Sequence, residues 1–171
     1  QFLDGDDLLH PEKFKCQIDH FMSDDTIDVS YSNHQHYFSD SNRYRTYEFD
    51  EVEPFPLKQL LSGWQNGVSL PLHAPIFRRS IWNSNELPYP EDYFARCEDW
   101  VFLVLVAAKN KRFSYLDKVL CTYIIHNENF TKDIKKSCIA AVQAAHYLEN
   151  KIPLELQRDF VSGVIDRSLD R

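Results

Sequence analysis

The stretch that decides the fold is QFLDGDDLLHPEKFKCQIDHFM, residues 1–22. A short apolar run leads into three carboxylates, and Pro11 then suits the first turn of a helix, where a missing N–H costs nothing. Apolar residues follow at the spacing of one helix face, namely Phe14, Ile18, Phe21 and Met22. The pattern predicts a strand, an acidic loop and a helix, a unit typical of α/β domains.

The rest of the chain continues this alternation of strands and helices. In chain order we predict a strand over 26–33, a hairpin or loose excursion over 33–52, a short helix over 56–67, an edge or bulged strand over 68–80, a buried helix beginning at Glu98 or Asp99, two short strands around a turn at Asp117 and Lys118, an amphipathic helix from Thr131 to Pro153, and a last helix towards Arg171. The fold class expected is therefore α/β with a mixed sheet and C-terminal helices.

Composition limits the kinds of function. The chain has 171 residues, 43% of them hydrophobic, which fits one packed domain. No apolar run approaches the roughly 18 residues of a membrane span. A net charge of -7 argues against nucleic acid as a partner. The cysteines are widely spaced in apolar surroundings and predict buried free thiols in a reducing, cytoplasmic compartment: Cys16, Cys97, Cys121 and Cys138.

The opening acids are the first candidate site. A strand that ends in Asp-Gly-Asp would place Asp4 and Asp6 at the carboxyl edge of a sheet, where open α/β folds bind ligands. Gly5 allows the sharp turn between them. Carboxylates of this kind suit Mg²⁺ or Mn²⁺ together with phosphate oxygens and water. The alternative is a plain acidic turn in which Asp7 or a neighbour caps the following helix.

Three further groups could carry chemistry. Glu98 and Asp99 are either acids that stabilise a helix start or the source of a general base, and Trp100 beside them is either core or a face for a sugar ring. His73 and His126 close two predicted strands and are either buried histidines or metal ligands. The adjacent cations Arg78 and Arg79 suit phosphate recognition.

Taken in order, these signals resemble a known family. The segments LDGDDLLHP, SLPLHAPIFRRSIW, CEDWVFLVLV and FSYLDKVLCTYIIHNENFT resemble the second half of inverting family-two glycosyltransferases with the GT-A fold. The resemblance covers Phe2 to Thr131. It implies a catalytic-domain segment over 1–131, beginning at the D-x-D strand, and a helical extension over 132–171.

The resemblance implies a role for several residues of the first part of the chain. Asp4 and Arg78 would contact a nucleotide-diphosphate-sugar donor, and Asp6 would bind the divalent metal that bridges the diphosphate, with Asp7 nearby. His126 would lie at the metal or the diphosphate. Ile124 stands where the family often has Arg, which puts one phosphate contact in doubt.

The remaining implied roles concern the acceptor. Asp99 would deprotonate the acceptor hydroxyl, and Glu98, Trp100 and His73 would lie close to that acceptor, a glycan, a lipid-linked sugar or another hydroxyl compound. The resemblance also implies polysaccharide biosynthesis in a parent protein at the inner face of a membrane. Because the family's nucleotide-binding half would precede Gln1, we expect this polypeptide alone to bind donor poorly.

Two other functions stay open. Haloacid-dehalogenase-like phosphohydrolases also begin with a strand into D-x-D, but they usually have Thr or Val where this chain has Leu8. A non-catalytic domain that binds carbohydrate or protein through aromatic side chains is the second alternative. Its surface would comprise Tyr37, Phe38, Tyr44, Tyr47 and Trp64.

Overall fold

A computed structural model describes residues 1–47, 54–62, 70–82, 97–127 and 134–156. The chain divides into two compact units, each of which is described by itself. The first comprises Gln1–Pro54, Ser69–Ile81 and Arg112–Asn129, and the second comprises Phe55–Val68, Trp82–Lys111 and Phe130–Arg171. The second unit thus combines segments from both sides of the predicted boundary at residue 131.

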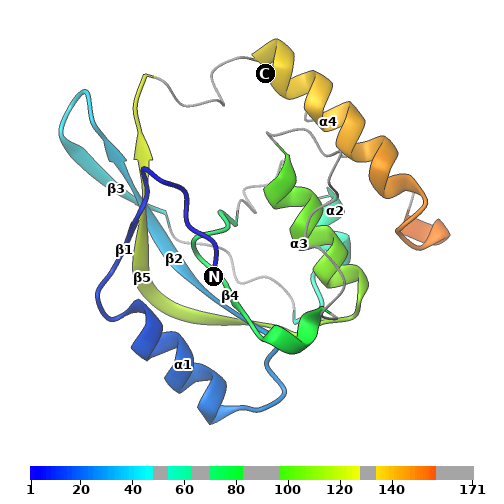
Figure 1. Ribbon diagram of the computed structural model, residues 1–171, viewed down its shortest axis with the longest axis horizontal. Coiled ribbons are helices and arrows are strands. Elements are labelled where there is room, and N and C mark those ends of the chain that lie inside the picture. Colours follow the sequence, from blue (N-terminus) through cyan, green and yellow to red (C-terminus); the bar gives the residue numbers. More distant parts are fainter. Residues whose placement is uncertain (48–53, 63–69, 83–96, 128–133, 157–171) are drawn as a thin grey trace. The chain divides into compact units, whose positions relative to one another are not determined.

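The first unit is built on a mixed, open sheet, in agreement with the predicted α/β class (Figure 1). Its strands, in spatial order, are β1 (Leu8–Leu9), β5 (Phe113–Ile125), β2 (Val29–Phe38) and β3 (Arg43–Tyr47), and β4 (Ile76–Phe77) also pairs with β2. The long β2 and β5 run parallel, and every other pairing is antiparallel. Residues 76–77 are the only part of the predicted strand over 68–80 that is a strand among the residues described.

The predicted opening strand is wrong. Residues 1–4 belong to no strand, and the acids come before the first strand instead of after it. The backbone N–H of Asp7 donates to the carbonyl of Asp4 at 3.3 Å, which closes the acidic stretch into a turn. Only then does β1 pair with Cys121 and Thr122 of β5.

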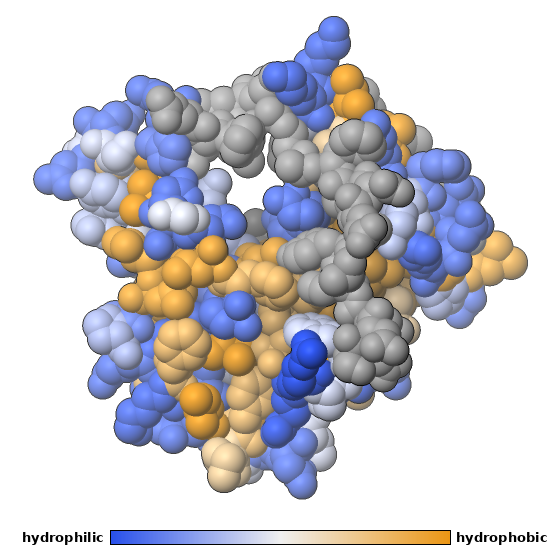
Figure 2. Space-filling model, in the orientation of Figure 1, coloured by the Kyte–Doolittle hydropathy of each residue, from blue (hydrophilic) through white to orange (hydrophobic). Residues whose placement is uncertain are grey.

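The predicted first helix is confirmed as α1 (Lys13–Ser23), but its faces are reversed. Lys13 and Gln17 are fully buried, whereas Phe14, Ile18 and Met22 are about half exposed or more. Figure 2 shows the resulting apolar surface along the visible side of α1. Hydrogen bonds explain the reversal. Lys13 donates to the backbone carbonyl of Ala74 and Gln17 to that of Ser30, and apolar side chains could not satisfy these buried acceptors.

The segment predicted to form two short strands is one continuous strand, β5, so that prediction is wrong. The expected turn at Asp117 and Lys118 is a bulge. Ser32 of β2 lies opposite Leu116, but the next residue, Asn33, lies opposite Val119. Asp117 and Lys118 do interrupt the regular strand, as a turn would, but the chain does not reverse. They are extra residues of β5 within its parallel pairing with β2.

The hairpin predicted within 33–52 is confirmed as β2 and β3. Asn42 closes its turn with a φ of 50°, a left-handed conformation that Asn adopts more readily than most residues. The Tyr37 hydroxyl donates to the Asn42 side chain at 2.9 Å, and the rings of Tyr37 and Tyr44 lie 4.8 Å apart across the hairpin. Two members of the predicted aromatic surface therefore do lie together.

The second unit is helical in its described part. It contains α2 (Leu57–Ser62), α3 (Glu98–Ala108), α4 (Ile134–Glu149) and a short 3-10 helix at Leu154–Leu156. These confirm the predicted helix start at Glu98 and the helix that ends before Pro153, whereas the Thr131 cap and the last helix lie outside the described residues. No helix in the described ranges is long and apolar enough to cross a membrane.

Trp100 joins two of these helices. It is 2% exposed, and its indole N–H donates to the backbone carbonyl of Leu60 in α2 at 2.7 Å. Replacing Trp100 with Phe keeps an aromatic ring but leaves that buried carbonyl without its indole donor. We expect the free energy of unfolding to fall by about 1–3 kcal/mol in urea titrations. A Trp82→Phe variant is the matched control, and an equal loss in both variants would contradict this role of the indole N–H.

Candidate functional site

An acid and a histidine far apart in the sequence meet at the edge of the first unit. His126 Nε2 lies 2.8 Å from Asp6 Oδ2. Asp6 belongs to the turn before β1, and His126 directly follows β5, so the pairing of β1 with β5 brings them together. The hydrogen bond from His126 holds the pKa of Asp6 below its ordinary value, and both side chains remain 30–45% exposed. This is an ionised, accessible carboxylate beside an imidazole.

The next residue, Asp7, forms a buried ion pair with His73. His73 Nδ1 is 2.8 Å from Asp7 Oδ2, and the two side chains are 2% and 0% exposed. The other carboxylate oxygen of Asp7 accepts the backbone N–H of Ile124 at 2.9 Å. Burial alone would lower the pKa of His73, but Asp7 and the nearby Cys121 outweigh it and raise that pKa to about 9. His73 is therefore an imidazolium at neutral pH, held by the Asp7 carboxylate.

Two more histidines lie beside this pair. His34 and His36 occupy the same face of β2, and their Nε2 atoms are 3.1 Å apart. The ring of His34 lies 6.2 Å from that of His73, and Tyr123 stacks on His73 at 6.0 Å. Burial is the main reason that the pKa falls to about 3 for His34 and about 4 for His36. Both are therefore neutral under conditions in which His73 is charged.

A buried lysine completes the polar interior. Lys13 donates to Gln17 Oε1 at 2.5 Å and to the carbonyl of Ala74 at 2.7 Å, and burial lowers its pKa to about 8. We call the following five side chains, each at least nine-tenths buried, the polar layer: Asp7, Lys13, Gln17, His34 and His73. The layer anchors α1 and the turn at residues 71–74 to the sheet, and it supports the segment that carries Asp6.

Asp4 and Arg78, which the resemblance assigned to the nucleotide-sugar donor, differ in their contacts. Asp4 is exposed in the turn before β1. Arg78 instead donates to the backbone carbonyls of Ile27 and Phe21 at 2.5 and 3.1 Å, and its guanidinium lies over the Phe21 ring. Through these hydrogen bonds Arg78 links the end of α1 to the residues just before β2. The contacts of Arg78 therefore indicate a structural role.

The predicted acceptor-side residues divide between the two units. His73 lies in the polar layer of the first unit, where it is closed to solvent. Glu98, Asp99 and Trp100 begin α3 in the second unit, and Asp99 accepts the backbone N–H of Trp100 at 2.7 Å. The burial of Trp100 gives its ring a packing role. Glu98 and Asp99 are half-buried at the positive end of the helix.

The predicted metal ligands Asp6 and His126 lie together, but the presence of a metal stays a prediction. No group of three potential ligands is assembled among the residues that the structure describes. Asp6 and His126 supply one carboxylate oxygen and one imidazole nitrogen. Mg²⁺ and Mn²⁺ commonly take one or two protein groups and complete their shell with phosphate oxygens and water. The pair is therefore chemically suited to part of such a shell, and substrate or solvent would supply the rest.

Sequence reasoning left most of the polar layer unassigned. His34 and His36 lie two residues apart in the segment predicted as a hairpin or loose excursion, and in a strand of such a hairpin that spacing places both on one face. Lys13 and Gln17 gave no such signal, because their burial depends on backbone carbonyls of other segments that accept their hydrogen bonds. Cys97 and Cys121 are buried free thiols, as predicted, whereas Cys16 is a free thiol that is partly exposed, so its predicted burial is wrong.

The chain was compared with models of known protein families and with curated protein sequences, and neither comparison found a match.

Proposed function

We propose that the chain is part of a metal-dependent, inverting glycosyltransferase of the GT-A type that uses a nucleotide-diphosphate-sugar donor. The observation that carries this proposal is the Asp6–His126 contact of 2.8 Å. The two residues that the family resemblance assigned to one metal lie 120 positions apart in the sequence, yet they share an accessible edge. The mixed sheet is compatible with this fold class.

In this proposal the bound metal would neutralise the diphosphate leaving group. Asp6 would contribute a carboxylate oxygen and His126 an imidazole nitrogen, while the exposed Asp4 would contact the nucleoside part. The buried Asp7–His73 pair would hold the backbone at Ile124 and thus the strand that leads to His126. These residues would form the donor side of the reaction.

Asp99 would act on the acceptor side. As a general base it would take the proton of the acceptor hydroxyl while the sugar–phosphate bond breaks on the opposite face of the sugar ring. Its position in the first turn of α3 places it at the positive end of the helix. The same proposal includes a cytoplasmic parent protein that acts in polysaccharide biosynthesis. Its acceptors would include lipid-linked sugars at a membrane.

The proposal is tested by Mn²⁺ titration of the full chain, followed by electron paramagnetic resonance, with and without uridine diphosphate. Asp6→Asn and His126→Ala should each weaken Mn²⁺ binding about tenfold or more, since each removes a proposed ligand. Asp99→Asn should leave Mn²⁺ affinity unchanged because it is proposed as a base. Asp40→Asn, an exposed acid in the hairpin turn, is the matched control.

Unchanged Mn²⁺ affinity in both ligand variants would rule out this metal site. The phosphohydrolase alternative makes a separate prediction, namely Mg²⁺-dependent release of para-nitrophenol from its phosphate ester, lost in Asp4→Asn. Asp4 follows a segment that is not a strand, which departs from the strand into D-x-D that both the phosphohydrolase alternative and the glycosyltransferase resemblance would have. Binding of glycans that survives both Asp6→Asn and Asp99→Asn would favour the non-catalytic alternative.

A further inference from the structure

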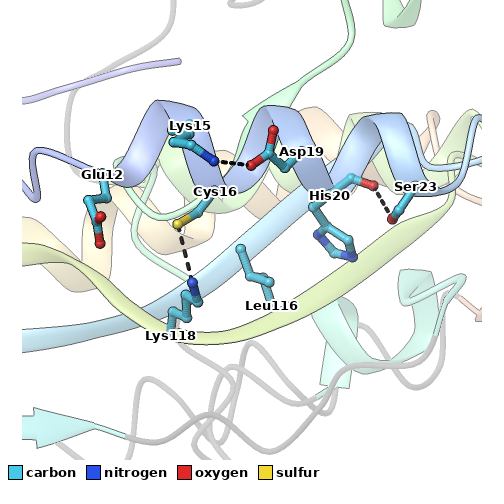
Figure 3. A pocket seen from close by; sticks show the side chains of 8 residues that line it. All are labelled: Glu12, Lys15, Cys16, Asp19, His20, Ser23, Leu116 and Lys118. Atoms are coloured by element: carbon cyan, nitrogen blue, oxygen red, sulfur yellow. Dashed lines mark hydrogen bonds and ion pairs between the residues drawn. The ribbon is translucent and has the colours of Figure 1, made fainter.

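A pocket of about 380 Å³ lies between α1 and β5 in the first unit, away from the Asp6–His126 contact. Its walls include Cys16 and Lys15 from α1 and Lys118 from β5. Figure 3 shows the Cys16 sulfur and the Lys118 amine directed towards one another across the pocket. A nucleophilic thiol and a primary amine therefore face each other from two different elements.

The contact between these two groups is close. Lys118 Nζ donates to Cys16 Sγ at 3.4 Å. Cys16 is partly exposed, whereas Cys97 and Cys121 are 1% and 2% exposed. Oxidation of thiols follows their accessibility, so Cys16 is the first to meet a dissolved oxidant among the free thiols described.

The bulge in β5 is what presents the amine. No residue of β2 lies opposite Asp117 or Lys118, because the register passes from Ser32–Leu116 directly to Asn33–Val119. The Asp117 carboxylate is held by the Tyr115 hydroxyl at 3.0 Å and by the Asn33 side chain at 3.3 Å. Bulges commonly redirect a side chain, and this one is fixed on the side of Asp117 while Lys118 extends towards α1.

The second lysine of the pocket is engaged elsewhere. Lys15 Nζ lies 2.6 Å from Asp19 Oδ2, one helical turn along α1. Lys118 is therefore the amine placed at the Cys16 sulfur, and Lys15 provides a neighbouring amine with a different partner for comparison.

We propose that Cys16 and Lys118 form a reversible covalent cross-link when the protein meets a peroxide. In the first step the Cys16 thiol is oxidised to a sulfenic acid, and one oxygen of hydrogen peroxide leaves as water. In the second step the Lys118 nitrogen attacks the sulfur, the S–O bond breaks, and a second water leaves. The sum is one thiol, one amine and one H₂O₂ giving one S–N bond and two waters.

The cross-link would tie α1 to β5 between positions 102 residues apart. Closing so large a loop restricts the unfolded chain, so the oxidised protein should melt roughly 5–10 °C higher than the reduced protein. Thiols such as dithiothreitol would reverse the link and restore both side chains. This device is independent of the proposed sugar-transfer function.

The test treats the purified full chain with hydrogen peroxide and maps its peptides by mass spectrometry. We expect a linked pair of peptides that contain Cys16 and Lys118, about 2 Da lighter than their sum, which dithiothreitol separates. Trypsin should also fail to cleave after the linked Lys118. Oxidation of Cys16 only to acids, with Lys118 unmodified, would overturn the proposal.

Three variants control the experiment. Lys118→Arg keeps the positive charge but removes the primary amine, and it should reduce the linked product to background and abolish the rise in melting temperature. Cys16→Ser should do the same. Lys15→Arg, the matched change in the same pocket, should leave the linked product unchanged. Equal linkage in Lys118→Arg and the wild type would also overturn the assignment.

Discussion

Replacing Asp7 with Ala should lower the free energy of unfolding at pH 7 by about 3–5 kcal/mol, the usual cost of breaking a buried ion pair. Asp7, together with the nearby Cys121, outweighs burial and raises the pKa of His73 to about 9, which corresponds to about 3 kcal/mol relative to an unperturbed histidine. The substitution also leaves the buried N–H of Ile124 without the acceptor it has at 2.9 Å. Urea denaturation followed by circular dichroism measures the loss.

The matched control for this prediction is Asp19→Ala. Asp19 also pairs with a cation, Lys15, at 2.6 Å, but both side chains are more than 60% exposed, so we expect only a small change. Asp7→Asn should fall between the two, because an amide keeps an acceptor for Ile124 but carries no charge. If Asp7→Ala and Asp19→Ala cost the same, the buried pair does not stabilise the fold.

The second large effect is a loss of stability in acid. His34 and His36 have folded-state pKa values of about 3 and about 4, below the ordinary value of 6.5. The unfolded chain therefore binds more protons between pH 6.5 and pH 4, and stability falls as the pH falls through this window. Each histidine contributes about 1.4 kcal/mol per pH unit at full effect, so the two together should lower the free energy of unfolding by roughly 6 kcal/mol between pH 6.5 and pH 4.

His73 should act in the opposite direction above neutrality. Its folded-state pKa is raised to about 9, so its stabilisation is complete below pH 6.5 and is lost as the pH rises towards 9. Lys13, with a pKa lowered to about 8, adds stability between pH 8 and pH 10.5 because its buried charge disappears there. We therefore expect a stability maximum near pH 6.5, a decline to about pH 8, a level course to about pH 9, where the two effects oppose each other, and a rise from there towards pH 10.5.

Urea midpoints measured from pH 4 to pH 10 check both limbs. A His34→Gln, His36→Gln double variant should lose most of the acid limb, whereas His10→Gln, an exposed histidine, should keep it. Asp7→Asn should remove the alkaline decline, because the pKa of His73 then lacks its main partner. A wild-type profile that is flat between pH 4 and pH 8 would contradict the assigned charge states.

The elements confirmed from sequence are those that local signals determine. The start of α3 at Glu98 and the turn of the β2–β3 hairpin depend on residues within a few positions of each other. The strand placed before Asp4 failed because apolar residues alone do not provide a pairing partner. The turn expected at Asp117 failed because a long parallel neighbour made a bulge more favourable than a chain reversal.

The candidate site divides along the same line. Asp6 and His126 were singled out from sequence, but their contact depends on β1 lying beside β5, which no short-range pattern encodes. The burial of Lys13 is less predictable still, because a lysine on a helix is normally exposed. It becomes reasonable only when the carbonyl of Ala74, 61 residues away, is in place to accept a hydrogen bond from Lys13.

The bulge in β5 also changes which residues of the strand share a face. Two steps along β2, from Ser32 to His34, correspond to five steps along β5, from Leu116 to Cys121. The difference is odd, so the odd-numbered residues after the bulge continue the face that the even-numbered residues occupied before it. That change of parity sets Cys121 beside His34 and Tyr123 beside His36. Removing a single residue at the bulge would exchange inside and outside for the rest of the strand without altering any side chain in the polar layer.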